Sequence, residues 1–319
     1  MGSTSGEDLP VEVSFTNLDE PLFDGAGATK RDLVEYLDAV SDRLLPALEG
    51  RPLSVIRVHR GQEAFMQKNV PKHTPPCVPT VRWWAESSKR EVSYALCNDR
   101  RTLLWFANQR AVEYHPTLVT AARPDRATHL VLDLDPPDAG AFPLAVRTAH
   151  LVRRALADLG LHGAVKTSGA KGLHVFVPVG DVALEDGAAA TRAIAARAER
   201  FDPSIATTAF MKADREGKVF VDATRVGGAT VVAAYSPRVR PGVPVSFPFA
   251  WDELDEVTPS DFTVKTAVGR LDSRDPWAEH LPAPQQLPEE LVEEGHAIPA
   301  GRVQAMHEGK RRARARRTS

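Results

Sequence analysis

The segment "THLVLDLDPPD" at 128–138 constrains this chain more than any other stretch. It is typical of a largely buried β-strand that two prolines bring to an end. Because side chains alternate along a strand, Asp133 and Asp135 share one face, while Leu132 and Leu134 occupy the other. Two carboxylates so close together repel each other unless positive charge lies between them. The fold therefore has to bring a cation to this strand.

The elements that follow predict where this strand sits in a sheet. We expect a helix near 143–159, a hairpin of "GAVKT" and "LHVFVPV" joined by "SGAKG", a helix near 186–202, and a strand "KVFVD". This β-α-β-β-α-β order is the ferredoxin-like split motif, in which the first strand lies between the third and the last. Asp133 and Asp135 would then neighbour His174 on one side and Asp222 on the other.

Outside this motif the pattern is less regular. We expect a helix over 29–48 with Thr29 and Asp32 as its capping pair, and a loop at "NVPKHTPPCVP". A strand "EVSYALC" followed by a helix "TLLWFANQRAVEY" is expected next, and an edge or extended segment at "PRVRPGVPVSFPFAW". Residues 281–309 are rich in Pro and Glu and are expected to form an exposed appendage.

Charge is unevenly distributed along the chain. Six of the last ten residues, "KRRARARRTS", are Lys or Arg and none is acidic, whereas the net charge of the whole chain is -2. A basic tail on an acidic body favours salt-sensitive contact with a polyanion such as DNA. A solvated, disordered end explains the same composition equally well.

Composition also excludes several classes of protein. No apolar run approaches the ~18 residues that would cross a membrane, and the N-terminus lacks a secretory signal, so a cytoplasmic location is expected. Cys77 and Cys97 are the only cysteines and are far apart in sequence, which argues against a disulfide framework or a cysteine-based zinc site.

The acids of the middle region could bind metal. An all-oxygen donor set suits Mg²⁺ or Mn²⁺. With Asp222 as a third ligand, Asp133 and Asp135 could hold two ions ~3.5–4 Å apart, an arrangement used for phosphoryl transfer. The alternative is a half-buried strand whose acids merely face water.

The turn "KTSGAKGLH" adds groups that suit phosphate. Its glycines at 169 and 172 allow a sharp turn and close backbone approach, and Ser168, Lys171 and His174 supply a hydroxyl, a cation and an imidazole. It is not a Walker loop. A plain glycine hairpin and a core histidine remain alternatives. Three arginines add cations nearby in sequence: Arg215, Arg238 and Arg240.

Taken in order, four segments resemble one known family: "HLVLDLDPP", "KTSGAKGLHVFVPV", "GKVFVDATR" and "AYSPRVRPGVPVSFPFAWDEL". They are similar to the polymerase domain of bacterial ATP-dependent DNA ligase D, in the archaeo-eukaryotic primase superfamily, from about 15 to 254. The resemblance implies an α/β (α+β) primase-like fold with an RRM/ferredoxin-like catalytic core and an N-terminal α/β subdomain. It also implies a nucleotidyltransferase, a primase-polymerase, that extends primers or fills gaps during non-homologous end joining. Such enzymes typically use Mn²⁺ and prefer ribonucleotides.

The resemblance assigns roles to individual residues. The metal-binding, catalytic carboxylates would be Asp133, Asp135 and Asp222. The groups that bind the nucleoside triphosphate would be His115, Ser168, Lys171, His174, Arg215, Arg238 and Arg240. The DNA-binding residues would be Asn17, Lys30, Phe65, Met66 and Lys68, with Phe65 stacking on the template base.

Several positions depart from the family pattern. Glu20 stands where a lysine of the downstream 5′-phosphate pocket is expected, and an acid there repels phosphate. Met66 replaces the second stacking aromatic. Ile56 occupies a further basic position of the nucleotide pocket, with Arg57 beside it. "DATRVGGAT" lacks the more usual aromatic and Asn.

The resemblance also predicts how the chain is organised. We expect a flexible N-terminus at 1–14, a primase-polymerase domain at 15–280 divided at 125/126, and a C-terminal extension with the basic tail at 281–319. A ligase domain is not expected, so the partners would be DNA, a separate ATP-dependent ligase and an end-binding repair protein, in a nucleoid-associated location.

Two other functions fit parts of the sequence. A degenerate relative could bind DNA ends and recruit a ligase without catalysis. A phosphatase of the haloacid dehalogenase type would explain "VLDLD", but Pro137 stands where that family expects Thr or Val, and no Gly-Asp-x-x-x-Asp follows.

Overall fold

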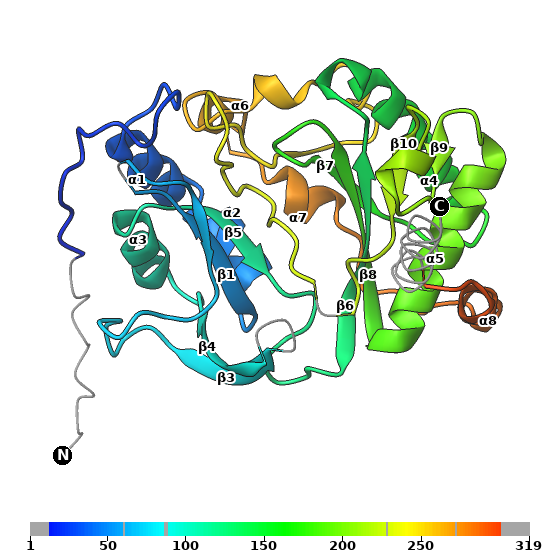
Figure 1. The fold of residues 1–319 in the computed structure, drawn as a ribbon, viewed down its shortest axis with the longest axis horizontal. Coiled ribbons are helices and arrows are strands. Elements are labelled where there is room, and N and C mark those ends of the chain that lie inside the picture. Colours follow the sequence, from blue (N-terminus) through cyan, green and yellow to red (C-terminus); the bar gives the residue numbers. More distant parts are fainter. Residues whose placement is uncertain (1–12, 60, 86–88, 228, 272, 301–319) are drawn as a thin grey trace, which may run out of the picture.

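The computed structural model describes residues 13–59, 61–85, 89–227, 229–271 and 273–300. They form two sheets that stand side by side, one built from the first part of the chain and one from the second (Figure 1). Most of the predicted N-terminal segment 1–14 and the whole basic tail at 310–319 lie outside the described residues. Within those residues, no helix has the length and apolar character that crossing a bilayer requires.

The first half contains a five-stranded sheet in the order β2-β1-β4-β3, with β5 also paired to β1. Its elements are α1 (Lys30–Ala39), α2 (Ser41–Leu48), β1 (Pro52–Arg57), β2 (Phe65–Gln67), β3 (Thr80–Ala85), β4 (Arg90–Leu96), α3 (Arg100–Asn108) and β5 (Ala111–Pro116). The predicted capping pair is confirmed: the Thr29 side chain accepts from the Asp32 N–H, and Asp32 accepts from the Thr29 N–H. The predicted loop lies between β2 and β3.

The single helix expected over 29–48 is wrong, because the chain bends at Val40. This residue ends α1 and begins α2, and its N–H donates to Tyr36 of the preceding turn. The bend lets apolar side chains of both helices reach the same core: Leu33 and Leu37 of α1, and Leu44 and Leu48 of α2, are fully buried. Burial of both apolar faces therefore outweighs helical continuity.

The helix expected over "TLLWFANQRAVEY" is wrong in its second half. Helix α3 ends at Asn108, and Arg110 adopts a left-handed backbone, φ 60°. The Arg110 guanidinium donates to the carbonyls of Pro21 and Leu22, which holds this turn. Residues 111–116 then form β5, a buried strand paired with β1. Sheet pairing and burial override the local helical spacing.

The second half contains a six-stranded sheet in the order β11-β7-β8-β6-β10-β9. Its elements are β6 (Arg126–Asp135), α4 (Phe142–Ala157), β7 (Ala164–Thr167), β8 (Leu173–Ala183), α5 (Leu184–Phe201), β9 (Ala206–Thr207), β10 (Val219–Asp222) and β11 (Pro248–Phe249). Short 3₁₀ turns lie at η1 (Ala139–Ala141), η2 (Lys212–Asp214) and η3 (Pro259–Asp261). The predicted split motif is confirmed, since β6 lies between β8 and β10, and β11 forms the predicted edge.

Helices α4 and α5 cover one face of this sheet (Figure 1). Gly187 of α5 lies so near β6 that a β-carbon there would be 3.4 Å from Leu130 Cδ2. Leu132 and Leu134 follow Leu130 on the same face and are fully buried. Asp133 and Asp135 therefore occupy the other face, which is turned toward the first half of the chain.

The described part of the expected appendage, 281–300, is not simply exposed. It contains α8 (Glu289–Ala297), which follows two short helices that lie before it in the chain, α6 (Ala267–Leu271) and α7 (Pro276–His280). Helix α8 packs on α5: Leu291 is fully buried, and Glu294 pairs with Arg197 at 2.6 Å. Composition predicted exposure here, but one apolar face of α8 suffices to dock it.

Substitution of Gly295 by alanine tests this docking. A β-carbon at Gly295 would lie 1.9 Å from the Ala189 carbonyl oxygen, so α8 must shift. We expect Gly295→Ala to lower the free energy of unfolding by about 1–3 kcal/mol. Gly269→Ala in α6 is the control, because a β-carbon there meets nothing within 4 Å. Urea denaturation measures both variants, and equal midpoints would show that α8 is not held by this contact.

Candidate active site

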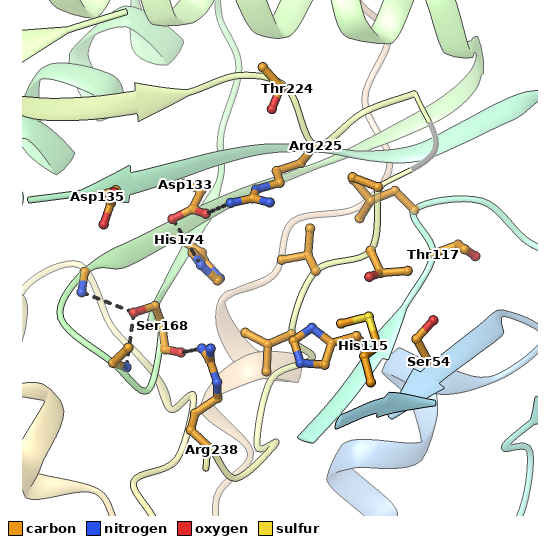
Figure 2. A pocket seen from close by; sticks show the side chains of 18 of the residues that line it. Ser54, His115, Thr117, Asp133, Asp135, Ser168, His174, Thr224, Arg225 and Arg238 are labelled. Atoms are coloured by element: carbon orange, nitrogen blue, oxygen red, sulfur yellow. Dashed lines mark hydrogen bonds and ion pairs between the residues drawn. The ribbon is translucent and has the colours of Figure 1, made fainter. Parts of the chain in front are cut away.

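A cleft of about 1570 Å³ separates the two halves. Ligand pockets for small molecules usually measure about 300–1,000 Å³, so this cleft has room for more than a nucleotide. Of the residues singled out in the sequence, its lining includes Met66, Lys68, His115, Asp133, Asp135, Ser168, Lys171, His174, Arg238 and Arg240. The fold thus brings most of the predicted site into one cavity, part of which is seen in Figure 2.

The register of three strands sets the centre of this site. Asp133 on β6 lies directly opposite Asp222 on β10 and opposite His174 on β8. Asp135 lies opposite Phe220, two residues further along β6. The predicted gathering of the acids and His174 on three adjacent strands is therefore confirmed, while the roles assigned to them stay predictions.

Asp133 and Asp222 share one cation, Arg225. Its Nη2 lies 2.5 Å from Asp133 Oδ2 (Figure 2). The same Nη2 lies 3.2 Å from Asp222 Oδ2. Burial alone would raise the pKa of Asp133, but His174 and Arg225 hold that pKa well below its usual range. Asp222 also accepts hydrogen bonds from the N–H and hydroxyl of Thr224, at 2.8 and 2.6 Å. Sequence analysis missed Arg225, although its place three residues after Asp222 was a signal.

Asp135 is neutralised by different cations. Lys171 Nζ lies 3.0 Å from Asp135 Oδ1, and Arg215 Nη1 lies 3.2 Å from Asp135 Oδ2. Arg215 is held in place by the carbonyls of Ala209 and Phe210, and its guanidinium lies 3.9 Å from the centroid of the Phe220 ring. Two cations predicted to bind the nucleotide thus pair with Asp135 of β6 in this structure.

The three carboxylates match divalent metal ions by their chemistry. Carboxylate oxygens are preferred ligands of Mg²⁺ and Mn²⁺. In the arrangement described, no three acidic, His or Cys side chains among the described residues are grouped around a single ion position. Arg225, Lys171 and Arg215 supply the positive charge instead. The three carboxylates fit a divalent metal ion. To bind it they would have to give up their ion pairs with these three side chains.

The turn at 168–172 depends on both of its glycines. A β-carbon at Gly172 would lie 2.0 Å from the Leu134 carbonyl oxygen, so only glycine lets this turn close against β6. Gly169 has a left-handed backbone, φ +66°, and packs against Arg238. Ser168 Oγ accepts hydrogen bonds from the N–H groups of Ala170 and Gly172, at 3.2 and 3.1 Å. Ser168 also lines the cleft.

Lys166 is a second residue that sequence analysis missed. It is fully buried, and its Nζ lies 2.9 Å from His174 Nδ1 and within hydrogen-bond distance of Ser246 Oγ. Burial, and then the charge of Arg238, lower its pKa well below the usual value. A donor at Nδ1 puts the proton of a neutral His174 ring on Nε2, which lies 3.4 Å from Asp133 Oδ1. The hairpin register, which pairs Lys166 with His174, was the available signal.

Glu113 is a third missed residue, and it joins the two halves. Its Oε2 lies 2.8 Å from His115 Nε2 and 3.0 Å from Arg238 Nε, and its Oε1 accepts from the Val239 N–H at 2.8 Å. Burial alone would raise the pKa of Glu113, but His115 and Arg238 lower it. Arg238 also donates to the Ser168 carbonyl. Glu113 was hidden because its segment was expected to be helical.

Part of the predicted DNA-binding surface is exposed at β2. Phe65 and Met66 are 38% and 46% exposed, and the Phe65 ring stacks on His59 with centroids 5.4 Å apart. Met66 lies opposite Ile56, and Lys68 lines the cleft. Trp84, 57% exposed on β3, also lines the cleft and was not singled out in the sequence. These side chains offer apolar surface at the cleft wall.

The predicted 5′-phosphate pocket has a different character. Lys30 is buried, and its Nζ donates to the Thr16 carbonyl at 2.6 Å and to Asn108 Oδ1 at 2.7 Å. Asn17 is exposed with a left-handed backbone, and Glu20 pairs with Arg110 at 3.3 Å. Arg57 is likewise buried, and it donates to Gln67 and Gln109. Lys30 and Arg57 therefore hold the backbone and neighbouring side chains together in this structure.

Titration of His174 tests the buried cluster. Burial, followed by Lys166, lowers the pKa of His174 from 6.5 to about 4. Between pH 4 and 6.5 the folded protein then binds fewer protons than the unfolded chain. The stabilisation that the neutral His174 gives the folded state is therefore lost as pH falls from 6.5 toward 4. NMR of the histidine rings, assigned with His174→Asn, should give a midpoint near 4. A midpoint near 6.5 would mean that the imidazole is not enclosed as described.

Comparison with known proteins relates this chain to one family. The model of the LigD primase-polymerase domain matches residues 29–277. The bifunctional non-homologous end joining protein LigD of Bacillus subtilis is 32% identical over 284 residues, which is 87% of this chain and 45% of that protein. The multifunctional LigD of Mycobacterium tuberculosis is 34% identical over 268 residues, 80% of this chain and 34% of that protein. The chain thus spans less than half the length of these relatives.

A solved structure is similar over nearly its whole length. It is the polymerase domain from Mycobacterium tuberculosis ligase D in complex with DNA. It matches with a TM-score of 0.78 and 32% sequence identity, and the match covers 85% of this chain and 98% of that one.

Proposed function

Because this chain belongs to the LigD primase-polymerase domain family, whose members are nucleotidyltransferases, we propose that it extends the 3′ ends of DNA at gaps or breaks. The observation that carries the proposal is the register that puts Asp133, Asp222 and His174 side by side, with Asp133 and His174 at the cleft beside the Ser168 turn. Acids beside phosphate-binding groups are what nucleotidyl transfer requires.

In this proposal the 3′-hydroxyl of a primer attacks the α-phosphorus of a nucleoside triphosphate in line, and pyrophosphate leaves. Asp133, Asp135 and Asp222 would hold divalent ions, Mn²⁺ or Mg²⁺, which supply Lewis acidity to the attacking and leaving oxygens. Arg238 and Arg240 bind the triphosphate, Ser168 donates its hydroxyl, and His174 donates from Nε2. The acids act as ligands and need not accept the proton.

Two cations have to change partners during binding. Lys171 and Arg215 pair with Asp135 in this structure. Because metal would neutralise Asp135 in their place, both become able to turn toward the phosphates. His115 is held by its hydrogen bond to Glu113 and lines the same cleft as the turn at 168–172. It completes the nucleotide pocket.

The DNA is proposed to lie along the wall formed by β2. Phe65 and Met66 offer a stacking surface for a template base, and Lys68 offers a cation for the backbone. The names of the relatives describe non-homologous end joining, and the similar solved structure contains DNA. By analogy we place this chain in end joining or gap repair at the nucleoid, with a preference for ribonucleotides. Its partners would be a separate ATP-dependent ligase and an end-binding protein.

The alternatives are less well supported. The family match leaves no feature that favours a haloacid dehalogenase-type phosphatase. If this protein binds DNA but adds no nucleotide, its function is to recruit a ligase without catalysis. The buried state of Lys30 weakens only the phosphate pocket of the family pattern, not the carboxylate site.

Primer extension on a short gapped duplex tests the proposed activity. With Mn²⁺ and each of the eight ribo- and deoxyribonucleotides supplied separately, the wild-type protein should extend the primer. Asp133→Asn and Asp135→Asn should each reduce extension about a hundredfold or more, because each removes a charged ligand. DNA binding, followed by fluorescence anisotropy, should stay within a factor of about two.

Asp181→Asn is the matched control for this experiment. Asp181 is an exposed acid on the same sheet with a left-handed backbone that Asn tolerates. Extension should be unchanged in this variant. Normal extension by Asp133→Asn would show that the carboxylate assignment is wrong.

The role of Glu20 is tested by charge reversal. Glu20→Lys removes an acid beside Arg110 and should tighten binding of gapped DNA with a downstream 5′-phosphate about three- to tenfold over DNA with a 5′-hydroxyl. Asp19→Lys makes the same charge change at a neighbouring exposed residue. It should raise affinity for both DNAs equally. If Glu20→Lys behaves like Asp19→Lys, the phosphate lies elsewhere.

A further inference from the structure

Arg225 occupies the point where the catalytic carboxylates most need positive charge. Asp133 and Asp222 face each other directly across β6 and β10, and like charges in that position destabilise a sheet. The guanidinium of Arg225 lies against both, 2.5 Å from one and 3.2 Å from the other. One protein cation thus neutralises two of the three proposed metal ligands.

Arg225 is held less completely than Arg215 and Lys171, the two cations that pair with Asp135. Arg215 donates to two backbone carbonyls as well as to Asp135, and Lys171 donates to Pro136 and Pro137 as well as to Asp135. Among the described residues, Arg225 pairs with the two carboxylates. Its Nε is buried without a hydrogen-bond partner, although a guanidinium normally uses all its donors when buried.

The position of Arg225 in the chain also leaves it room to move. It follows the end of β10 at Asp222 and lies outside any helix or strand. Its side chain is 34% exposed and lines the cleft. It can therefore leave the carboxylates by side-chain rotation into the cleft, without breaking the sheet.

We propose that Arg225 is a resident counter-cation, which occupies the carboxylates in the metal-free protein and which a divalent metal has to displace. This inference rests on the proposed metal-binding role of Asp133 and Asp222. It goes beyond that role because it makes metal affinity depend on a residue that is not a ligand. Metal and guanidinium compete for the same oxygens, so the apparent affinity for metal is reduced by the fraction of molecules in which Arg225 is bound.

The competition has two opposite consequences for an Arg225 variant. Without metal, Arg225→Gln leaves two facing carboxylates uncompensated and should melt at a lower temperature than the wild type. With metal, no guanidinium has to be displaced, so Mn²⁺ should bind more tightly. A residue with a purely structural role would lower stability without improving metal affinity.

The test is calorimetric titration of Mn²⁺ into the full chain, with neither nucleotide nor DNA present. Arg225→Gln should bind Mn²⁺ about tenfold more tightly than the wild type, a usual size for coupling between two equilibria. Arg225→Lys keeps the positive charge but lacks the planar guanidinium that contacts both carboxylates. Its increase in Mn²⁺ affinity should therefore be smaller, about threefold. Arg100→Gln is the matched control: it removes an exposed ion pair with Asp38 on α1 and should leave Mn²⁺ affinity unchanged.

Equal or weaker Mn²⁺ affinity in Arg225→Gln overturns the proposal. If that variant does not fold without metal, Arg225→Lys is titrated instead. Mn²⁺ affinity equal to or weaker than that of the wild type then overturns the proposal. Thermal melting with and without Mn²⁺ gives a second readout, since the variant should gain more stability from the ion than the wild type does.

Asp133→Asn separates this inference from the proposed function. If Asp133→Asn loses Mn²⁺ binding and Arg225→Gln shows no gain, the metal site stands and only the counter-cation is refuted. If Asp133→Asn binds Mn²⁺ as the wild type does, the metal assignment itself fails, and the counter-cation fails with it.

Discussion

Two carboxylates that face each other across neighbouring strands impose a charge requirement on everything around them. Asp133 and Asp222 are largely withdrawn from water, and separating one buried charge from its partner costs several kcal/mol, about 3–5 in typical cases. This charge is balanced by Arg225, which lies between the two carboxylates, and the His174 ring lies beside Asp133. Lys166 lies behind that ring, where burial lowers its pKa and lowers its tendency to carry charge. The centre of the site is a set of groups whose charges have to be balanced together.

The same principle extends outward to the cleft. Asp135 pairs with Lys171 and Arg215, and Glu113 pairs with His115 and Arg238. Each of these cations suits a phosphate as well as a carboxylate. Under the proposed function, an exchange of partners from these acids to phosphate would form the nucleotide-binding site. Glu113 has a further consequence, because it ties β5 of the first half to the segment of Arg238 in the second.

Much of the architecture followed from patterns in the sequence. The resemblance to the LigD polymerase domain and its α/β primase-like fold are confirmed, as is the central place of β6 between β8 and β10. The errors share a cause. The sequence pattern predicts one helix through Val40, a helix over β5 and an exposed segment at α8. The structure has a bend, a buried strand and a docked helix at these places. In each case local spacing or composition was outweighed by burial against distant parts of the chain.

The sequence by itself determined which face of β6 carries Asp133 and Asp135, because alternation along a strand needs no knowledge of its neighbours. It also determined that the turn with Gly169 and Gly172 would suit close backbone approach. Only the tertiary structure decided which cation meets which acid. Lys30, expected at a phosphate, is buried against backbone and Asn108, while Arg225, not expected at all, lies between two carboxylates. Ion pairs depend on distances between segments remote in sequence, and those distances arise only when the sheets have formed.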